Sequence, residues 1–339
     1  MHAIVLVGGF GTRLRPLTYT VPKPMLPVGN EPIITRLVRR LEKAGVTTVT
    51  LALGFLPDPF KTAFPGDRLG SVELRYAVEP EPLDTAGGIR FAADHTGVDG
   101  TFLALNGDNV TDLDVAELIA AHRRFGGAAT LHLTSVDDVS AFGVVETGPD
   151  GRVLRFLEKP APGVTDSRFI NAGTYVMEPR VLDEITPGIP VNIERVTFPT
   201  LAGRGELFGF GTDDYWTGTD RPDLLLQANL DRLAGRFDAD MQHPVSDGRG
   251  VDPTARVADD ADVVDTVIGA EVSVGAGSRL RRSVLLAGSS VGKDVVVEDS
   301  VVMGSVPDDA VLSGAVIGAD AAIEPGQQVI NERIPSPTT

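Results

Sequence analysis

The 339-residue sequence contains no cysteine, which excludes disulfide bonds and thiolate metal sites and fits a reducing cytoplasm. It lacks any run of about 18 to 20 apolar residues, so no membrane span is expected. No basic segment followed by an apolar run precedes the strand expected from His2, so no targeting segment is expected. The 30 basic residues are outnumbered by 47 acidic ones, and the net charge of −17 argues against nucleic acid or an anionic membrane as a partner.

What the sequence does contain is a concentration of cations near its start. In so acidic a chain, we expect any bound phosphate to be held by a local cluster of this kind. The basic residues of the first sixty positions that form it are Arg13, Arg15, Lys23, Arg36, Arg39, Arg40 and Lys43.

Apolar runs alternate with helical patterns through the first two thirds of the chain. Buried parallel strands are short apolar runs, whereas helices repeat their apolar residues every three to four positions. The pattern predicts strands at 2–7, 46–53, 72–78, 101–106, 128–134 and 171–177, a hairpin over 142–160, and helices at 31–44, 85–94, 114–125, 193–202 and 222–235. This order indicates an α/β fold with a Rossmann-like, doubly wound and mostly parallel sheet up to about residue 235.

Beyond about residue 240, aliphatic residues recur six positions apart. The series is Val257 and Val263; Ile268, Val274 and Leu280; Leu285, Val291 and Val297; Ile317, Ile323 and Val329. A six-residue period is typical of a parallel β-helix, in which each hexad forms one face of a triangular coil. Ordinary short strands are the alternative, but they have no reason to repeat every six residues.

These patterns predict a domain at 1–236, a linker at 237–256, a left-handed β-helix at 257–332 and a disordered tail at 333–339. The register of the hexads slips near 265–268, 281–285 and 303–311, so several coils are expected to be imperfect.

The segment "LVGGFGTRLRPLT" at 6–18 follows the first predicted strand. Its glycines do not form a dinucleotide fingerprint, because Leu14 stands where the third glycine belongs, and no Lys-Ser/Thr pair makes it a Walker loop. Glycines allow positive φ and close backbone approach, so successive N–H groups can point at a phosphate chain. A simple turn is the alternative. Arg13 and Lys23, which are expected outside the core, favour a phosphate cradle.

"GGFGTRLRPLT" followed by "VPKPMLPV" resembles the signature of the sugar-1-phosphate nucleotidyltransferases, and within them the mannose-1-phosphate guanylyltransferase branch. The resemblance covers nearly the whole chain, since these enzymes often carry a C-terminal left-handed β-helix. It implies a reaction in which an NTP and a sugar 1-phosphate give an NDP-sugar and pyrophosphate, with Mg²⁺ as cofactor. GTP with mannose 1-phosphate, or with a related sugar or cyclitol phosphate, is favoured. Thymidylyl transfer to glucose 1-phosphate is the alternative.

The resemblance also implies roles for individual residues. Arg13 and Lys23 would stabilise the leaving pyrophosphate, and Asp108 would bind the metal. The implied nucleotide-binding residues are Leu6, Gly8, Gly9, Gly11, Thr12, Arg13, Gly87 and Asp108. The implied sugar-phosphate residues are Gly143, Glu158, Lys159, Asn171 and Gly173. Without the resemblance, Gly107-Asp108 after a strand reads as a turn, and Glu158-Lys159 as a solvated surface pair.

The sequence departs from the family pattern in three places. Asp84 stands in "EPLDTAGG" where the family often has glycine. In "DYWTGTDRP" the aspartate and glycine of the family's W-x-D-x-G-T-P are exchanged. Asp220 is a candidate second metal ligand through a local shift, and the alternative is a metal held by Asp108 and water. "NIERVTFP" keeps Glu194 but replaces the family's following lysine and glutamate by Arg195 and Val196.

Three functions are compatible with these features. An enzyme is favoured, because Arg13, Lys23, Asp108, Glu158 and Lys159 are all present. A non-catalytic regulatory relative that binds NDP-sugar is the alternative raised by the exchanged aspartate. A fused acyltransferase would need a histidine base in the β-helix, and no histidine follows His243. The β-helix is therefore expected to be an assembly or stabilising element. The chain is expected to be cytoplasmic and to form a homo-oligomer through this domain.

Overall fold

The computed structural model describes residues 1–54, 57–237 and 249–337. They form two compact units, of which the first comprises Met1–Gly9 with Leu37–Trp216, and the second comprises Phe10–Arg36 with Thr217–Thr339. Of the expected linker at 237–256, residues 238–248 lie outside the described residues. Within the described ranges, no helix combines the length and the apolar character needed to cross a membrane.

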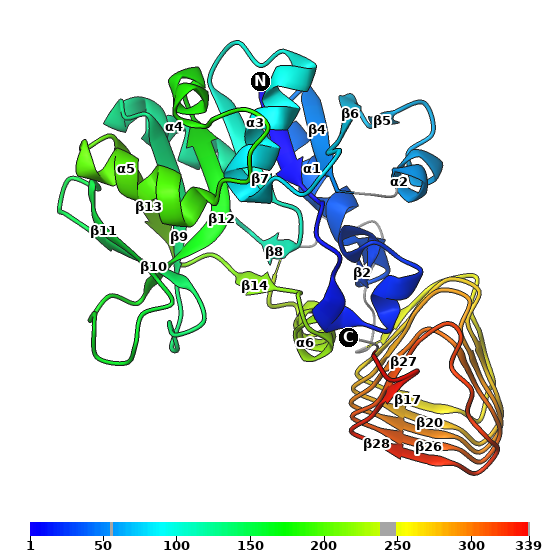
Figure 1. Cartoon of the computed structure of the whole chain (residues 1–339). Coiled ribbons are helices and arrows are strands. Elements are labelled where there is room, and N and C mark those ends of the chain that lie inside the picture. The colour runs from blue at the N-terminus through cyan, green and yellow to red at the C-terminus, as the bar shows by residue number, and fades with distance from the viewer. Residues whose placement is uncertain (55–56, 238–248, 338–339) are drawn as a thin grey trace. The chain divides into compact units, whose positions relative to one another are not determined.

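A ten-stranded sheet organises the first unit, with the strand order β11-β10-β12-β7-β1-β4-β6-β5 and with β9 pairing with β12 and β13 (Figure 1). The strands are β1 (His2–Leu6), β4 (Thr48–Leu53), β5 (Arg68–Leu69), β6 (Val72–Val78), β7 (Phe102–Asn106), β9 (Ala129–Ser135), β10 (Gly143–Thr147), β11 (Val153–Glu158), β12 (Phe169–Met177) and β13 (Leu207–Thr212). β1 pairs in parallel with β4 and β7, and β4 with β6. The expected Rossmann-like sheet is confirmed.

The sheet is mixed beyond β7, and on the other side its edge strand β5 runs antiparallel to β6. β12 runs antiparallel to both β7 and β9, and β10 and β11 form the expected antiparallel hairpin. β13, which the sequence did not predict, pairs in parallel with β9. The short strand β8 (Asn109–Thr111) follows β7, and β14 (Trp216–Gly218) precedes the last helix of the α/β part.

Except for the short helix Asp58–Ala63, which the sequence did not predict, the helices match their predicted positions to within a few residues. They are α1 (Ile33–Lys43), α2 (Asp58–Ala63), α3 (Asp84–Thr96), α4 (Val115–Phe125), α5 (Phe198–Gly203) and α6 (Pro222–Leu233). Local chemistry sets their ends: the Asp114 side chain caps α4 by accepting from two backbone N–H groups, and Gly126 ends it at φ 68°. The helix expected at 193–202 divides into a π-helical turn, Ile193–Thr197, and α5.

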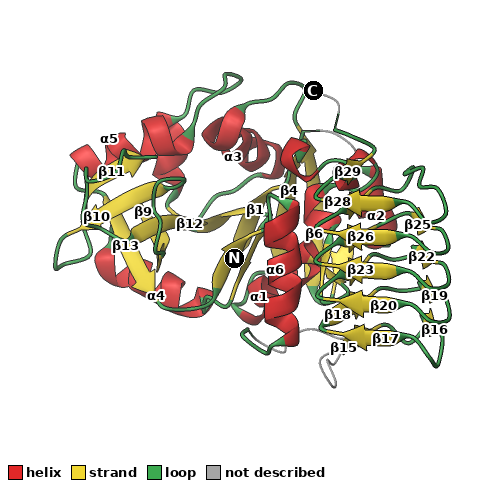
Figure 2. Ribbon diagram, turned by 90° about the horizontal axis from the view of Figure 1, so that it is seen from below, coloured by secondary structure: helices red, strands yellow, loops and turns green. Residues whose placement is uncertain are grey.

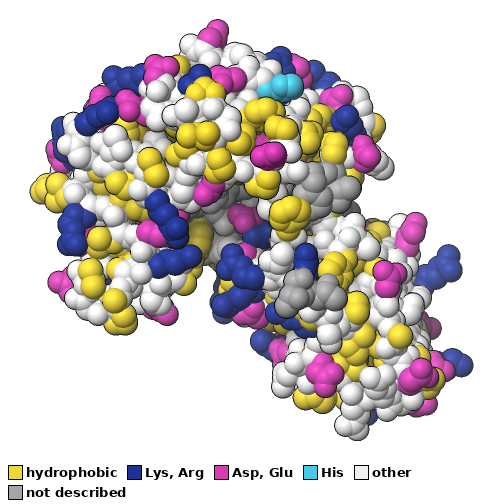
Figure 3. Space-filling model, in the orientation of Figure 1, with side chains coloured by type: hydrophobic (Ala, Val, Ile, Leu, Met, Phe, Trp, Pro, Cys, Tyr) yellow, Lys and Arg dark blue, Asp and Glu magenta, His cyan; other side chains and the backbone are white. Residues whose placement is uncertain are grey.

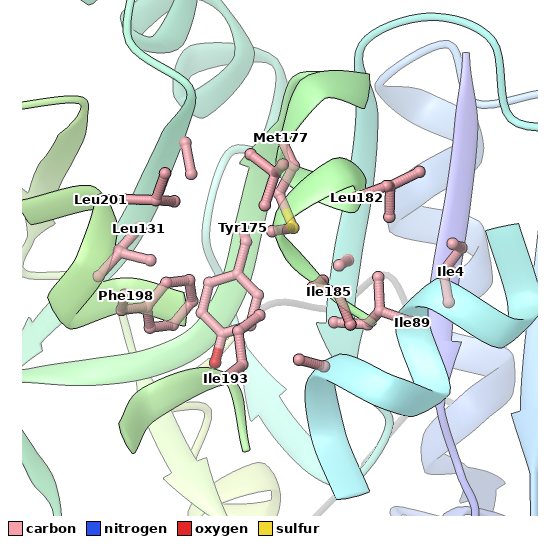
Figure 4. Close-up of a cluster of buried hydrophobic side chains, with 14 of the residues drawn as sticks. Ile4, Ile89, Leu131, Tyr175, Met177, Leu182, Ile185, Ile193, Phe198 and Leu201 are labelled. Atoms are coloured by element: carbon pink, nitrogen blue, oxygen red, sulfur yellow. The ribbon is translucent and has the colours of Figure 1, made fainter. Parts of the chain in front are cut away.

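The core of the first unit lies between the sheet and its helices. Figure 4 shows Tyr175 on β12 with its ring beside Phe198 of α5, at a centroid distance of 5.0 Å. Ile89 from α3 and Ile4 from β1 are fully buried in the same cluster. Burying such side chains supplies most of the driving force for folding, and here it fixes the strand ends that carry the candidate site.

The C-terminal strands form three parallel sheets of six, four and five strands. Successive coils of the chain stack on one another, and the strands of neighbouring coils pair within these sheets (Figures 1 and 2). In chain order they are β15 (Arg249–Val251), β16 (Arg256–Val257), β17 (Asp262–Val264), β18 (Thr266–Ile268), β19 (Ser273–Val274), β20 (Arg279–Arg281), β21 (Val284–Leu285), β22 (Ser290–Val291), β23 (Val296–Glu298), β24 (Val301–Val302), β25 (Ser305–Val306), β26 (Val311–Ser313), β27 (Val316–Ile317), β28 (Gln328–Ile330) and β29 (Arg333–Ile334). The arrangement is consistent with the expected left-handed β-helix.

The hexad residues point into this β-helix, and most of them, such as Leu280, Leu285 and Val329, are fully buried. Several corners between strands have positive φ, and those at Asp265, Arg282 and Asp309 coincide with slips of the hexad register. The strands begin at β15 and end with β29, so they extend beyond 257–332 at both ends, into the expected linker and tail.

The second unit also contains β2 (Pro27–Val28), β3 (Glu31–Pro32) and α6. Asn229 of α6 accepts a hydrogen bond from the Gly29 backbone N–H at 2.8 Å. The Asn30 side chain donates to the carbonyl oxygens of Gly250 and Ile268 in the first coils. The segment 10–36 is thereby packed with α6 and the first coils of the β-helix. On the visible face of the molecule, acidic and basic side chains are interspersed with hydrophobic ones (Figure 3).

Candidate active site

The predicted site residues fall in both units. The first unit contains Leu6, Gly8, Gly9, Gly87, Asp108, Gly143, Glu158, Lys159, Asn171 and Gly173, and the second contains Gly11, Thr12, Arg13, Lys23 and Asp220. Each of these residues is positioned by the strands, helices and turns of its own unit.

The glycine-rich segment starts where β1 ends, at the carboxyl edge of the parallel strands. A Cβ on Gly8 would lie 2.8 Å from the backbone nitrogen of Gly54, so a side chain does not fit there. A Cβ on Gly9 would have no atom within 4 Å. The first glycine is therefore required by close packing of two backbones, whereas the second leaves its backbone open to a ligand.

The loop continues in the second unit with a tight turn. Gly11 has φ 59°, and its carbonyl oxygen accepts a hydrogen bond from the Thr18 hydroxyl at 2.8 Å. The 3₁₀ turn Thr12–Leu14 follows and buries Leu14. Since Leu14 anchors the turn, the neighbouring Arg13 side chain is directed outward, and it is 71% exposed.

The outward guanidinium of Arg13 makes an ion pair with the exchanged aspartate. Arg13 Nη1 lies 2.6 Å from Asp220 Oδ2. Asp220 is therefore placed beside the signature arginine. Within the described part of the chain, no group of three or more His, Cys, Asp and Glu side chains is arranged to hold a metal ion.

Lys23 differs from Arg13 in its surroundings. It lies at the start of a 3₁₀ turn, Lys23–Met25, next to Pro22 and Pro24, and is only 9% exposed. The expectation that both cations lie outside the core is wrong for Lys23. The Lys23 side chain is therefore largely shielded from solvent.

Asp108 stands at the carboxyl end of β7, where it is half-buried. A Cβ on the preceding Gly107 would lie 2.9 Å from the carbonyl oxygen of Leu6, so this turn packs against the end of β1. A carboxylate at this edge has the hard oxygen ligands that Mg²⁺ prefers, and Mg²⁺ usually needs only one or two of them besides phosphates and waters. The Asp108 carboxylate therefore fits a Mg²⁺ ion that is bound mainly by phosphates and waters.

Gly143 and Glu158 face each other across the β10–β11 hairpin. Lys159 follows the strand at φ 48°, and its backbone N–H donates to the Phe142 carbonyl oxygen at 2.9 Å. Lys159 Nζ lies 3.7 Å from Glu158 Oε1. The hairpin thus brings together Gly143, Glu158 and Lys159.

β12 contributes Asn171 and Gly173 at the point where its pairing with β9 is interrupted. Gly173 has φ 77°, and a Cβ there would lie 2.6 Å from the Asn106 side-chain nitrogen. The Asn171 amide donates hydrogen bonds to the Tyr175 hydroxyl at 2.9 Å and to Glu194 Oε1 at 2.6 Å.

Glu194 is a residue of this site for which the sequence analysis predicts no role. Burial, together with the neighbouring Glu158 carboxylate, raises its pKa to about 7. Glu158 Oε2 is buried and has no hydrogen-bond partner within the described ranges. Glu194 therefore keeps its proton to a higher pH than an exposed glutamate does. Only its presence in the "NIERVTFP" motif pointed to Glu194.

The segment "EPLDTAGG" forms the start of α3, and Gly87 lies within the helix. A Cβ on Gly87 would lie 2.9 Å from the Ile189 carbonyl oxygen, so glycine is needed for this close approach. Asp84 has φ 57°, a conformation that glycine adopts freely and aspartate tolerates. The Asn192 amide donates to its carboxylate at 3.1 Å. This accounts for aspartate at a position where glycine is common.

The sequence matches the Nucleotidyl transferase family over residues 2–233. It is 37% identical over 307 residues to a mannose-1-phosphate guanylyltransferase of Mycobacterium tuberculosis, a match that covers 88% of this chain and 83% of that protein. A mannose-1-phosphate guanyltransferase of Candida albicans is 37% identical over 316 residues, which cover 89% of this chain and 86% of that protein.

Two solved structures are similar in fold and sequence. HddC of Yersinia pseudotuberculosis, complexed with GMP-PN, has a TM-score of 0.57 and 27% identity over 67% of this chain and 97% of its own. A Bacillus anthracis protein assigned as a glucose-1-phosphate thymidylyltransferase has a TM-score of 0.62 and 25% identity over 71% of this chain and 98% of its own. The expected resemblance is confirmed, and enzymes of this kind generally use a divalent metal ion. The chain therefore belongs to the nucleotidyl transferase family.

Proposed function

We propose that this chain transfers a guanylyl group from GTP to mannose 1-phosphate, or to a related sugar or cyclitol phosphate. The observation that carries the proposal is the similarity, at 36–41% identity, to curated proteins named mannose-1-phosphate guanylyltransferases. The signature arginine and both lysines of the family pattern are present in this sequence.

In this reaction an oxygen of the sugar phosphate attacks the α-phosphorus of the nucleotide. A new P–O bond forms as the bond to the β-phosphate oxygen breaks, and pyrophosphate leaves with the electron pair. The attacking phosphate is already an anion, so no proton has to be removed. The protein therefore needs charge stabilisation and positioning rather than a nucleophile or a base.

Each cation has a part in this scheme. Arg13 and Lys23 stabilise the charge of the leaving pyrophosphate, and the open backbone at Gly9 supplies an N–H donor to phosphate oxygens. Lys159 holds the attacking phosphate. Glu158, in contact with Glu194, accepts hydrogen bonds from hydroxyl groups of the sugar.

Asp108 would hold Mg²⁺, with Asp220 as the second protein ligand. The ion, when bound, neutralises charge on the triphosphate. Asp220 already contacts Arg13 at 2.6 Å, so it is directed toward the same loop that is proposed to receive the phosphates.

The proposal places the enzyme in the cytoplasm as a homo-oligomer assembled through the β-helix. Thymidylyl transfer to glucose 1-phosphate is a second candidate, favoured by the similarity to the Bacillus anthracis structure.

A pyrophosphate-release screen tests the proposal. GTP, dTTP, UTP and ATP are each combined with mannose 1-phosphate and glucose 1-phosphate in the presence of Mg²⁺. GTP with mannose 1-phosphate should give the highest kcat/KM. Preference for dTTP and glucose 1-phosphate would establish the second candidate. Absence of turnover with every pair, together with measurable binding of GDP-mannose, would indicate a regulatory relative.

A further inference from the structure

The loop that carries Arg13 is held by the last coil of the β-helix, within the second unit. Arg333 of β29 donates from one guanidinium nitrogen to the carbonyl oxygen of Arg13 at 2.8 Å and to that of Arg15 at 3.1 Å. Hydrogen bonds from a charged donor are stronger than those between neutral groups. Arg333 therefore joins the backbone of the signature loop to a strand 320 residues further along the chain.

A second contact lies beside the first. Pro16 packs on Gly318, which follows β27, and a Cβ on Gly318 would lie 2.8 Å from the Pro16 Cβ. A side chain at Gly318 would therefore push the loop away. The Thr20 hydroxyl approaches the Met303 sulfur, which follows β24, at 3.5 Å. Three coils of the β-helix thus contact the same short loop.

The side chain of Arg13 is held at its other end by Asp220, at 2.6 Å. Its backbone carbonyl is bound by Arg333 and its guanidinium by Asp220, so both ends of the residue are fixed. An exposed arginine that is free to rotate would have to be ordered when the nucleotide binds, which costs conformational entropy.

We propose that Arg333 is a positioning residue for the nucleotidyl transfer reaction: the terminal coil of the β-helix presets the loop that places Arg13 on the nucleotide's phosphates. The inference rests on the proposed function for the role of Arg13. It gives the β-helix a part in catalysis in addition to assembly.

The variants Arg333→Ala, Arg333→Lys and Gly318→Ala test the proposal, with Arg282→Ala as the matched control. Arg282 is a β-helix arginine whose side chain pairs with Asp299, at 2.8 Å, instead of with the loop. Arg333→Ala should lower kcat/KM for GTP roughly tenfold or more, with the KM for mannose 1-phosphate changed less than twofold. Arg333→Lys, which keeps a charged donor, should recover much of the loss, and Gly318→Ala should resemble Arg333→Ala. Arg282→Ala should stay within twofold of the natural chain.

Hydrogen–deuterium exchange separates failure of this inference from failure of the proposed function. The amides of Leu14 and Arg15, which donate within the loop turn, should exchange roughly tenfold faster in Arg333→Ala than in Arg282→Ala. Unchanged exchange, or faster exchange with unchanged GTP kinetics, would overturn the inference. If the natural chain has no turnover, the proposed function fails, and exchange together with calorimetric GTP affinity decides the inference by the same comparison.

Discussion

Arg13 and Lys23 have the same sign of charge and the same predicted role, yet they lie in different environments. Arg13 is 71% exposed on a turn anchored by Leu14, whereas Lys23 is 9% exposed between two prolines. The sequence motif identified both residues, but burial depends on tertiary packing that no local pattern records. Replacing Lys23 should therefore lower stability as well as turnover, and Arg13 is the better probe of catalysis.

Replacing Arg13 by alanine should lower kcat roughly 10²- to 10³-fold, the usual consequence of removing one charge-stabilising donor. The melting temperature should change little, because the side chain is largely exposed. Arg282→Ala is the matched control, since Arg282 pairs with Asp299 in the β-helix at 2.8 Å. Steady-state kinetics and thermal melting check the prediction. A loss of tenfold or less would remove Arg13 from the catalytic residues.

Asp220 has two possible partners, the metal and Arg13. If it binds Mg²⁺, Asp220→Ala should raise the Mg²⁺ concentration needed for half activity, and Asp108→Ala should nearly abolish turnover. The double variant Gly218→Asp with Asp220→Gly, which restores the family pattern, should keep or increase activity. Titrating the rate with Mg²⁺ distinguishes the two partners. A loss in Asp220→Ala that is the same at every Mg²⁺ concentration would assign the residue to Arg13 alone.

Glu194 makes stability depend on pH. Its pKa rises from 4.5 to about 7 on folding, because it is buried beside Glu158. Between these values the folded chain keeps a proton that the unfolded chain releases. Stability therefore falls as the pH rises from about 4.5, and the loss is complete above about 7.

Glu194→Gln removes this titration, and its amide can both accept from Asn171 and donate to the unpartnered oxygen of Glu158. Relative to the natural chain, the variant should be more stable at pH 8 than at pH 5 by about 1 to 3 kcal/mol. Denaturant unfolding at several pH values measures the difference, with the exposed Glu81→Gln as control. An equal difference at both pH values would show that Glu194 is ionised throughout.

At the scale of elements, apolar periodicity predicted most of the sheet. β13 was missed because Gly209 and Gly211 weaken the strand pattern. In the structure these glycines make room for Leu133 and Phe169, whose side chains would collide with a Cβ at 2.5 Å and 2.9 Å. The contacts of Arg333 could not be predicted either, since no local signal joins residues 320 positions apart.

The β10–β11 hairpin carries Lys159 at the end of its second strand. Lys159→Ala should raise the KM for mannose 1-phosphate at least tenfold while changing the KM for GTP much less, because the lysine is proposed to bind only the attacking phosphate. Arg155→Ala is a control on the same strand, where Arg155 pairs with Glu146 at 3.3 Å. Equal effects on both substrates would place Lys159 elsewhere in the site.

At the scale of the whole molecule, the two compact units do not coincide with the linear division between a domain at 1–236 and a β-helix at 257–332. The segment 10–36 belongs with the β-helix, through Asn30 and Arg333. Because this segment contains Gly11, Arg13 and Lys23, the C-terminal coils support residues proposed for catalysis.

Among the described residues, β28 and β29 are the last strands of their sheets and pair on one side only, with β26 and β27. The outer edge of such a terminal coil is expected to need a capping element or a second copy to cover it. Deleting residues 245–339 should therefore give a smaller oligomer, or a chain that aggregates because the surface of segment 10–36 is uncovered. Deleting only 336–339, which follow β29, should leave assembly unchanged.

Light scattering coupled to size-exclusion chromatography measures the subunit number of both variants. A truncated chain that is monodisperse with the subunit number of the full chain would show that assembly does not use the β-helix. Limited proteolysis then tests the support of the loop separately, since cleavage within 10–36 should be faster only in the larger deletion.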